Sequence, residues 1–252
     1  MREQTTGNDR AVSEVVGFIL VFSLVLITIA LVYTSGMGGL TDARDAEQMN
    51  NAERAFDVLA YNFEKMVRGE APHRATEVKL ADSTLAMEAN TQIRVKNESG
   101  DTITNMTQHQ PISYEVGSGS QVVYEHGAVI RVDDGHATMK RNPDLLFAND
   151  RLVFRYIEAG DFGGDGQRIS GDTTVLVRAS VTSSQLLYTS SDETVTIELE
   201  TNGERVEAWK RYFEENGGDC NSPSGEGQVT LECEFETEYF QLSRTRIQIE
   251  FT

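Results

Sequence analysis

The sequence is short of positive charge, of lysine and of cysteine, and the shortage of positive charge excludes a class of partner. The 22 Lys and Arg residues are outnumbered by 40 Asp and Glu residues, which gives a formal net charge of −18 at pH 7. Nucleic-acid grooves need clustered basic side chains that neutralise phosphate, so we expect no nucleic-acid partner. The acids alternate with apolar residues, however, and a folded core is therefore expected rather than disorder.

Lysine is scarce even among the basic residues, because arginine supplies most of the 22 positive charges. A large acid excess with arginine favoured over lysine suits a protein that stays soluble in concentrated salt. At about 1 M salt the Debye length falls to roughly 3 Å, so self-repulsion between the acids costs little. The composition predicts a halophilic source, and an acidic surface protein of a mesophile is the alternative.

Motifs that carry enzyme chemistry are also missing. The sequence has no G-x-S-x-G, no P-loop and no H-E-x-x-H. Its four histidines, His73, His109, His126 and His136, show no metal-ligand spacing. The stretch GSGS at 117–120 lies between predicted strands and is typical of a hairpin turn. We therefore expect no enzyme, no catalytic residue, no metal and no cofactor, although two catalytic residues distant in sequence would escape this search.

One loop keeps a calcium hypothesis open. The segment GDFGGDGQRISGD contains Asp161, Asp165 and Asp172, whose carboxylate oxygens are ligands that Ca²⁺ accepts. The spacing does not match an EF-hand, and loops rich in Asp and Gly are mostly ordinary turns. Calcium at the Asp161–Asp172 loop and a plain turn are both left open.

The two cysteines, Cys220 and Cys233, lie close together in the segment CNSPSGEGQVTLEC. Such a pair in an exported domain predicts a disulfide rather than a metal site. A bridge over this short loop stabilises a fold by roughly 3 kcal/mol in the chain-entropy model. Two free thiols are the alternative in a reducing compartment, so the location of the domain decides between them.

One long apolar run, VVGFILVFSLVLITIALVY at residues 15–33, contains no charged residue. As a helix it spans about 28 Å, close to the roughly 30 Å of a hydrocarbon core. Its side chains favour insertion by on the order of 5 kcal/mol. A secretory signal fits less well because its apolar region is about 7 to 15 residues long, although Ser35 and Gly36 leave a cut open. The run therefore predicts a helix that inserts into a membrane.

The orientation of this helix follows from the rest of the chain, because the charges before the run are balanced. Asn97 and Asn105 begin the glycosylation sequons Asn-Glu-Ser and Asn-Met-Thr. Together with the cysteine pair they favour an oxidising, extracytoplasmic location. We predict a single-pass cell-membrane protein with a cytoplasmic N-terminus and an extracellular C-terminal domain.

The segment DRAVSEVVGFILVFSLVLITIALVYTSG, residues 9–36, resembles the N-terminus of archaeal type IV pilin-like proteins, particularly haloarchaeal ones, with a class III signal peptide. In that family a membrane prepilin peptidase removes a polar leader on the cytoplasmic side, and the retained apolar helix forms the filament core. By position, the resemblance makes Arg10 the charged residue and Ala11 the small residue before the cut, and Val12 the mature N-terminus. Glu14 is then third, whereas bacterial pilins usually have a Glu fifth, so its role in subunit register stays open.

After the run, Gly36, Gly38 and Gly39 predict a flexible joint, and Thr41 predicts a helix cap. Apolar residues then recur at alternating spacings of three and four and form one helix face: Met49, Ala52, Phe56, Leu59, Phe63 and Met66. Gly69 and Pro72 end the helix. The stripe fits either a coiled coil or packing on the chain's own β domain, and both fit the resemblance.

From about residue 75 the apolar period changes to two, which predicts an antiparallel sandwich or barrel-like β domain. The expected strands are ATEVKLA, TQIRVKN, SQVVYEH, AVIRVDD, DRLVFRYIEA, TTVLVRASV, ETVTIELE, GQVTLECEFE and SRTRIQIEF. Turn signals such as SSDE separate them. A late helix at 201–218 begins with a predicted capping box, Thr201 and Glu204, and Trp209 is expected to anchor it to the sheet.

The predicted fold class is α+β with four segments: a leader at 1–11, a transmembrane or filament-core helix at 12–36, an amphipathic helix at 37–72 and an extracellular β-rich head at 73–252. The patterns and the resemblance predict a pilin-like structural subunit, a minor pilin, with its head on the cell surface. Membrane lipid, prepilin peptidase and other pilin-like subunits are the expected partners. The alternative is a single-pass surface binding protein that does not polymerise, and an exported hydrolase is less favoured.

Overall fold

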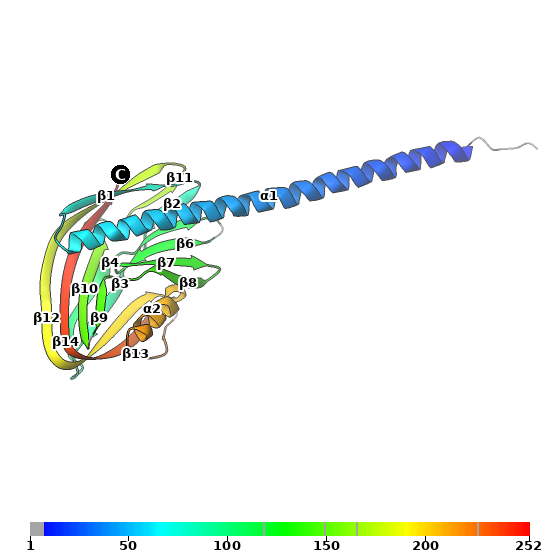
Figure 1. Ribbon diagram of the computed structural model, residues 1–252. Coiled ribbons are helices and arrows are strands. Elements are labelled where there is room, and N and C mark those ends of the chain that lie inside the picture. The colour runs from blue at the N-terminus through cyan, green and yellow to red at the C-terminus, as the bar shows by residue number, and fades with distance from the viewer. Residues whose placement is uncertain (1–7, 118, 149, 165, 226) are drawn as a thin grey trace, which may run out of the picture. The chain divides into compact units, whose positions relative to one another are not determined.

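The structure is a computed structural model that describes residues 8–117, 119–148, 150–164, 166–225 and 227–252, without the side chains of residues 8–13 and 42. The chain divides into two compact units, the first ending at Glu47 and the second being Gln48–Thr252. One long helix, a β domain of two sheets and a short late helix confirm the α+β class (Figure 1).

Helix α1 (Asn8–Val67) runs without a break through the glycines at which we expected a joint. That expectation is wrong, because glycine in a helix costs only about 1 kcal/mol relative to alanine and no proline interrupts the hydrogen bonds. The predicted cap at Thr41 is wrong as well, since its hydroxyl donates to the Met37 carbonyl within the helix at 3.0 Å. Gly69 ends the helix as predicted: its φ is 75° and its N–H donates to the Met66 carbonyl.

Two sheets form the β domain. Sheet A has eight strands in the order β4-β3-β12-β14-β10-β9, with β1 paired to β12 and β13 paired to β14. Its strands are β1 (His73–Lys79), β3 (Thr91–Lys96), β4 (Thr102–His109), β9 (Leu145–Ala148), β10 (Arg151–Gly160), β12 (Thr174–Asn202), β13 (Asp219–Cys220) and β14 (Gln228–Phe251). Among the described strands of sheet A, every pair is antiparallel except β10 and β14, which are parallel.

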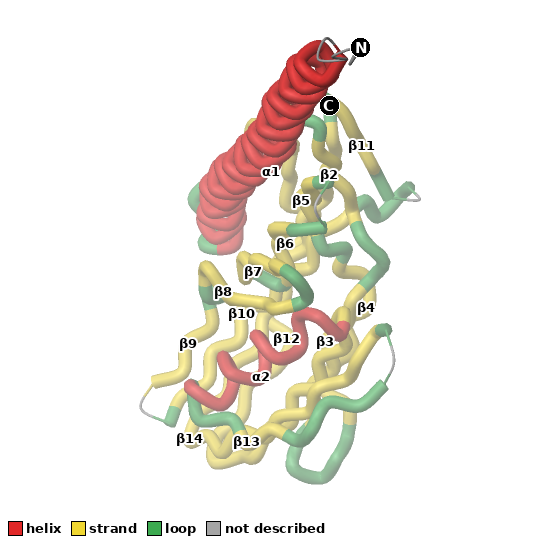
Figure 2. The backbone as a smooth tube through the Cα atoms, turned by 90° about the vertical axis from the view of Figure 1, so that its right-hand side faces the viewer, coloured by secondary structure: helices red, strands yellow, loops and turns green. Residues whose placement is uncertain are grey.

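Sheet B has six strands in the order β11-β2-β5-β6-β7-β8. Its strands are β2 (Ser83–Met87), β5 (Ile112–Val116), β6 (Gln121–Glu125), β7 (Ala128–Asp133), β8 (His136–Arg141) and β11 (Arg168–Gly171). They pair in antiparallel fashion, and the strands from β5 to β8 follow one another through short connections, such as the turn between β6 and β7. Figure 2 shows the strands of both sheets together with the short helix α2 (Gly203–Glu215).

The two longest strands, β12 and β14, each join two predicted strands into one. The turn predicted at SSDE is wrong, because β12 continues pairing with β14 on both sides of Asp192. Asp192 takes the left-handed φ of 52° that aspartate tolerates, so the strand bends there without ending. Register shifts between Val181 and Ser183 and between Leu186 and Tyr188 add to the curvature that Figure 1 shows.

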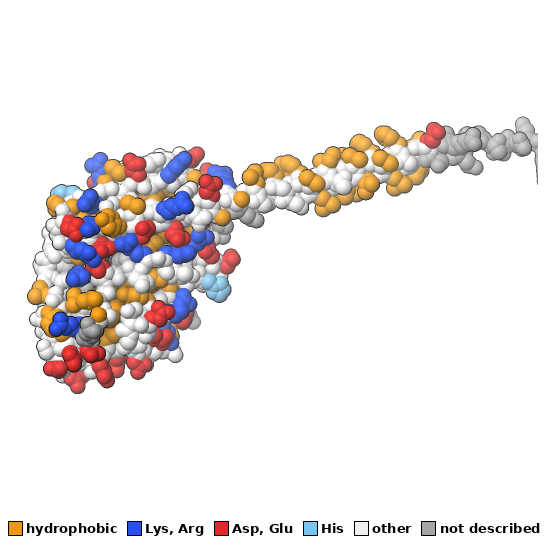
Figure 3. All heavy atoms as spheres, viewed as in Figure 1, with side chains coloured by type: hydrophobic (Ala, Val, Ile, Leu, Met, Phe, Trp, Pro, Cys, Tyr) orange, Lys and Arg blue, Asp and Glu red, His pale blue; other side chains and the backbone are white. Residues whose placement is uncertain are grey.

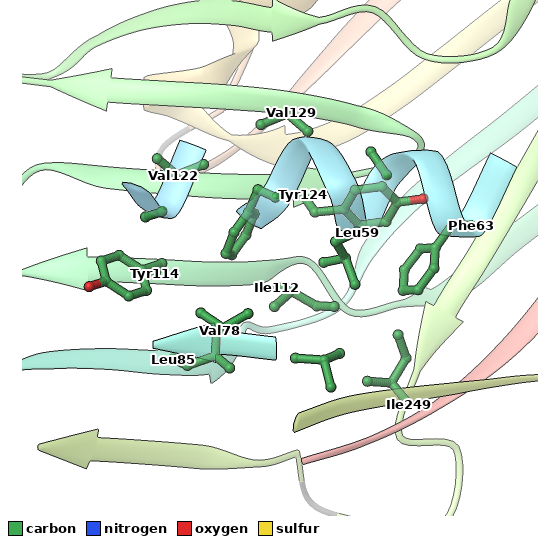
Figure 4. Packing of buried hydrophobic residues seen from close by; sticks show 14 of the residues in the cluster. Leu59, Phe63, Val78, Leu85, Ile112, Tyr114, Val122, Tyr124, Val129 and Ile249 are labelled. Atoms are coloured by element: carbon green, nitrogen blue, oxygen red, sulfur yellow. The ribbon is translucent and has the colours of Figure 1, made fainter. Parts of the chain in front are cut away.

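Two clusters of buried side chains form the core. The first contains the predicted stripe of α1, from Met49 to Met66, packed with residues of sheet B and of the C-terminal end of β14. Leu59, Phe63, Tyr124 and Ile249 meet in this cluster (Figure 4). The second cluster joins sheet A to α2 through residues that include Trp209. The stripe therefore packs on the chain's own β domain, and Trp209 is the predicted helix-to-sheet anchor.

Candidate functional site

The segment of α1 between Val15 and Leu40 has an apolar surface all the way round. Its seventeen large hydrophobic side chains are all exposed, for example Phe18 at 70% and Leu24 at 63%. Figure 3 shows hydrophobic side chains along the face of this segment that is turned to the viewer. A window of this helix has a mean hydropathy of 3.1 and no buried residue. Among the described residues, one helix near the N-terminus is thus long and apolar enough to cross a membrane, judged by length and composition.

Two of the polar side chains in this segment, Thr28 and Thr34, form hydrogen bonds with carbonyls of their own helix. Thr28 Oγ1 lies 2.7 Å from the Leu24 carbonyl, and Thr34 Oγ1 lies 2.9 Å from the Ala30 carbonyl. Such back-bonds need neither water nor another helix as partner. The hydroxyls therefore add little cost when the segment leaves water.

Apolar packing attaches the following part of α1 to the β domain. Phe56, Leu59 and Phe63 have no exposed surface, and the ring of Phe63 meets that of Tyr124 edge-on at a centroid distance of 4.9 Å. Each such side chain stabilises the contact by about 1.5–3 kcal/mol through burial, with an aromatic contribution of roughly 1 kcal/mol from the ring pair. Separating this part of the helix from the sheets would expose the core.

A row of ion pairs runs beside this apolar contact. Arg141 of β8 reaches Asp57 and Glu64 of α1, both at 2.7 Å. Arg131 of β7 lies 3.5 Å from Glu53, which also approaches Lys140 of β8 at 3.6 Å. Because these groups are partly exposed, each pair contributes only about 0.2–1 kcal/mol. The row fixes the helix along β7 and β8 more than it stabilises the domain.

The predicted processing residues are only partly described. Arg10, Ala11 and Val12 lie in the helical backbone of α1, and their side chains lie outside the description. Residues 1–7 of the predicted leader also lie outside the described residues. The cleavage prediction stays a prediction.

The disulfide prediction is confirmed. Cys220 and Cys233 are bonded and face each other as partners in the antiparallel pairing of β13 with β14. Cys233 is buried in the second core cluster. The bridge ties the segment after α2 to the central strand of sheet A.

Both glycosylation candidates lie on one hairpin of sheet A. Asn97 begins the turn between β3 and β4, and its Oδ1 accepts a hydrogen bond from the Asp101 N–H at 2.8 Å. Asn105 lies in β4 itself, with an exposed side chain. The sequence placed both sequons in the domain without indicating that they share an edge of the sheet.

The calcium hypothesis gains no ligand set from the structure. Asp161 accepts hydrogen bonds from the side-chain amides of Gln167 and Gln248, each at 3.0 Å. The bond from Gln167 is the main cause that lowers the pKa of Asp161. Asp165 lies outside the described residues, and Asp172 lies in an exposed position of the loop before β12. Within the described ranges no group of three or more His, Cys, Asp or Glu side chains could hold a metal ion.

Sequence patterns missed a buried polar network under α2. Glu125, at the end of β6, has no exposed surface. It accepts hydrogen bonds from Thr201 Oγ1 at 2.7 Å and from Trp209 Nε1 at 2.8 Å. Buried Arg205 lies 3.3 Å from Glu125 and 2.9 Å from Glu88. These contacts compensate the burial of the Glu125 charge.

The predicted capping box of α2 is wrong because of this network. The Thr201 hydroxyl is engaged with Glu125, and the helix begins one residue later than the box requires. Asn202 is the N-cap, and its Oδ1 accepts the N–H of Glu204 at 2.9 Å. The Asn residue at this position was the signal that could have identified the cap.

Two buried histidines adjoin the network. The rings of His109 and His126 lie 4.2 Å apart between centroids, and His126 Nε2 lies 3.0 Å from Thr91 Oγ1. The N–H groups of His126 and Ala159 point at the two ring nitrogens of His109, at 3.0 and 3.1 Å. Burial lowers the pKa of His126 to about 3, with a further contribution from Arg205, and burial also lowers the pKa of His109 well below its usual value. Both rings are therefore neutral in the folded domain.

Comparison with known proteins places the chain in a family but gives no activity. No solved structure matches the chain. An uncharacterized protein of Archaeoglobus fulgidus is 27% identical over 80 residues, which is 32% of this chain and 26% of that protein. The chain thus matches only about a quarter of that relative's length. A family model described as "Family of unknown function (DUF7289)" matches residues 10–250, and the chain belongs to that family.

Proposed function

We propose that this chain is a pilin-like structural subunit, a minor pilin, that is anchored in the membrane by the N-terminal part of α1 and presents its β domain outside the cell. The observation that carries the proposal is the exposed apolar segment from Val15 to Leu40. Keeping its side chains in water costs on the order of 20 kcal/mol. The segment therefore needs lipid or other apolar helices around it.

Lipid and a helix bundle both meet this need. At 1.5 Å per residue the segment is about 39 Å long, somewhat longer than a hydrocarbon core of roughly 30 Å. Before assembly it lies in the bilayer, and on assembly it packs against equivalent helices of other subunits. Gly17, Ser23 and Ala30 are small residues that allow close approach in such a bundle. Neither environment requires a catalytic residue or a cofactor.

The features of the β domain favour an extracytoplasmic location. The disulfide between Cys220 and Cys233 persists in an oxidising space, and both sequons lie on one surface hairpin. A cytoplasmic N-terminus then presents Arg10, Ala11 and Val12 to a prepilin peptidase. The partners in this proposal are membrane lipid, that peptidase and other pilin-like subunits.

Mass spectrometry of the full chain extracted from its membrane tests the processing step. We expect a mature N-terminus at Val12, abolished by Ala11→Phe and kept by the neighbouring control Ser13→Ala. An intact Met1 in cells with active prepilin peptidase contradicts the pilin-like proposal. A product that begins after Tyr33 contradicts the retained anchor as well.

Shearing of cells tests assembly separately. We expect the chain in the sheared filament fraction together with other pilin-like subunits. A correctly oriented chain found wholly in the membrane pellet supports the alternative, a single-pass surface binding protein that does not polymerise.

A further inference from the structure

The strands at the borders of the two sheets differ in how their unpaired edges are protected. The borders are β4 and β9 in sheet A and β11 and β8 in sheet B, and β1 lies beside β12. An unpaired edge offers its N–H and C=O groups to strands of other molecules. Natural proteins protect such edges by shortness, by charged residues or proline, by β-bulges, or by covering them.

Most of these edges carry one of these protections. β9 and β11 have four residues each, too short to template a stable pairing. β8 carries Lys140 and Arg141, which form ion pairs with α1. β1 carries Arg74, Glu77 and Lys79 along its length.

β4 is long and uncharged, and bulges are the main protection along its edge. Its eight residues, TITNMTQH, include no Lys, Arg, Asp, Glu or Pro. Among the described strands, β3 is its only ladder partner. At its C-terminal end, Arg246 of β14 donates to the Gln108 side chain and the Ala159 N–H of β10 points at the His109 ring. Two register shifts in the β3–β4 ladder bend the strand but add no charge. By composition and length, β4 is the edge most open to pairing with another chain.

A sequon lies in the middle of this edge. Asn105 and Thr107 are both exposed, and Met106 between them is buried, so the two sequon side chains share the outer face of the strand. The other sequon is less accessible: Asn97 is half-buried, and its side-chain oxygen is already bonded to the Asp101 N–H. The hairpin thus offers one open acceptor amide and one constrained amide.

We propose that Asn105 carries an N-linked oligosaccharide and that this glycan protects the β4 edge against pairing with other chains. The inference rests on the proposed function, because it requires the β domain to be outside the cytoplasm. The Asn105 side-chain nitrogen attacks the anomeric carbon of a lipid-linked oligosaccharide and forms a C–N bond. The bond from that carbon to the lipid phosphate oxygen breaks, its electron pair leaves with the phosphate, and a base takes the amide proton. No redox partner is needed.

Peptide mass spectrometry of the full chain, produced in an archaeal host that performs N-glycosylation, tests the site. Cleavage before aspartate separates the two sequons into the fragments 82–100 and 101–132. We expect added sugar mass on the second fragment of the wild type and its loss in both Asn105→Gln and Thr107→Ala. The matched control Asn97→Gln should keep the mass, because it removes the other sequon of the same hairpin.

External protease in the same cells separates failure of this inference from failure of the proposed function. An unmodified Asn105 on a domain that protease removes from outside overturns the inference alone. An unmodified Asn105 on a protected domain overturns both. If the glycan protects the β4 edge, extracted N105Q and T107A should begin to aggregate at a lower protein concentration than the wild type and N97Q. Equal aggregation onsets in all four proteins would overturn that protective role.

Discussion

The two parts of α1 share one backbone conformation and differ in the distribution of their apolar side chains. From Val15 to Leu40 these side chains surround the helix and are exposed, whereas between Met49 and Met66 most of them form one stripe that is buried. The second part also carries acids that pair with Arg131 and Arg141 of sheet B. Apolar content alone therefore does not predict burial within the chain; a one-sided stripe with a polar remainder does.

The largest expected difference is the response to acid of the apolar segment and of the β domain on which the second part packs. His109 and His126 are neutral in the folded domain and regain a pKa near 6.5 on unfolding, so the unfolded chain binds more protons below that pH. The contribution of the two neutral histidines to the free energy of unfolding should therefore be fully present above about pH 6.5 and should be lost as the pH falls toward 3. The slope is about 1.4 kcal/mol per pH unit for each histidine. The apolar segment has no group that titrates in this range, so membrane association should not change with pH.

Chemical denaturation at several pH values, monitored by Trp209 fluorescence, measures this slope. NMR gives a second readout: the imidazole signals of His109 and His126 should stay constant as the pH falls until the domain unfolds. A stability that is flat between pH 6.5 and 4 would contradict the prediction. Glu125, the carboxylate near the two histidines, already forms an ion pair with Arg205. It therefore does not compensate a new positive charge on either ring, and the charge of Arg205 opposes one.

Removing a buried ring from the second part should be the next largest effect. Phe63→Ala leaves a cavity against Tyr124 and should lower the free energy of unfolding by about 3–5 kcal/mol. Val58→Ala on the same part is the control, because Val58 is 51% exposed and its truncation should cost less than about 0.5 kcal/mol. Urea denaturation of both variants decides; equal losses would mean that the stripe is not the attachment.

The apolar stripe was predictable because the side chains that form it are close in sequence. The same holds for the disulfide and for the strands whose apolar residues alternate. The edge strand β4 was missed, because TITNMTQH is polar on an open side and has no alternation to detect. The sequon alone did not show that Asn105 lies on an edge strand; the order of the strands in sheet A did.

The buried network could not be predicted for a different reason. Glu125 meets Thr201, Arg205 and Trp209 across 76 to 84 residues of sequence. Each of these residues has an ordinary local role: a strand end, a cap candidate and a helix face. A buried charge is stable only when distant donors converge on it, and no local pattern encodes that convergence.

Introducing a charge into the apolar segment should have the third largest effect. It should weaken insertion into the membrane and leave the folding of the β domain unchanged. Leu24→Arg places a cation near the middle of the segment, where it costs about 2.5–3.5 kcal/mol of insertion free energy. The control Val58→Arg adds the same charge to the exposed side of the second part and should leave insertion unchanged. Carbonate extraction of membranes measures both, and an L24R protein that stays fully membrane-integral would argue against a bilayer-spanning role for the segment.

The smallest expected effect concerns the ion pairs beside the stripe. Arg141→Gln removes two contacts with α1, to Asp57 and Glu64, both at 2.7 Å, but the arginine is partly exposed and screened. We expect a loss of about 0.5–1.5 kcal/mol, consistent with two surface-type pairs, and a smaller loss in concentrated salt, where the Debye length is short. Arg168→Gln is the control, since its contact with Glu115 is long, at 3.9 Å, and exposed on both sides. Urea denaturation at low and high salt separates the two cases: a salt-independent loss for R141Q would assign the contribution of Arg141 to packing of its side chain instead of its charge.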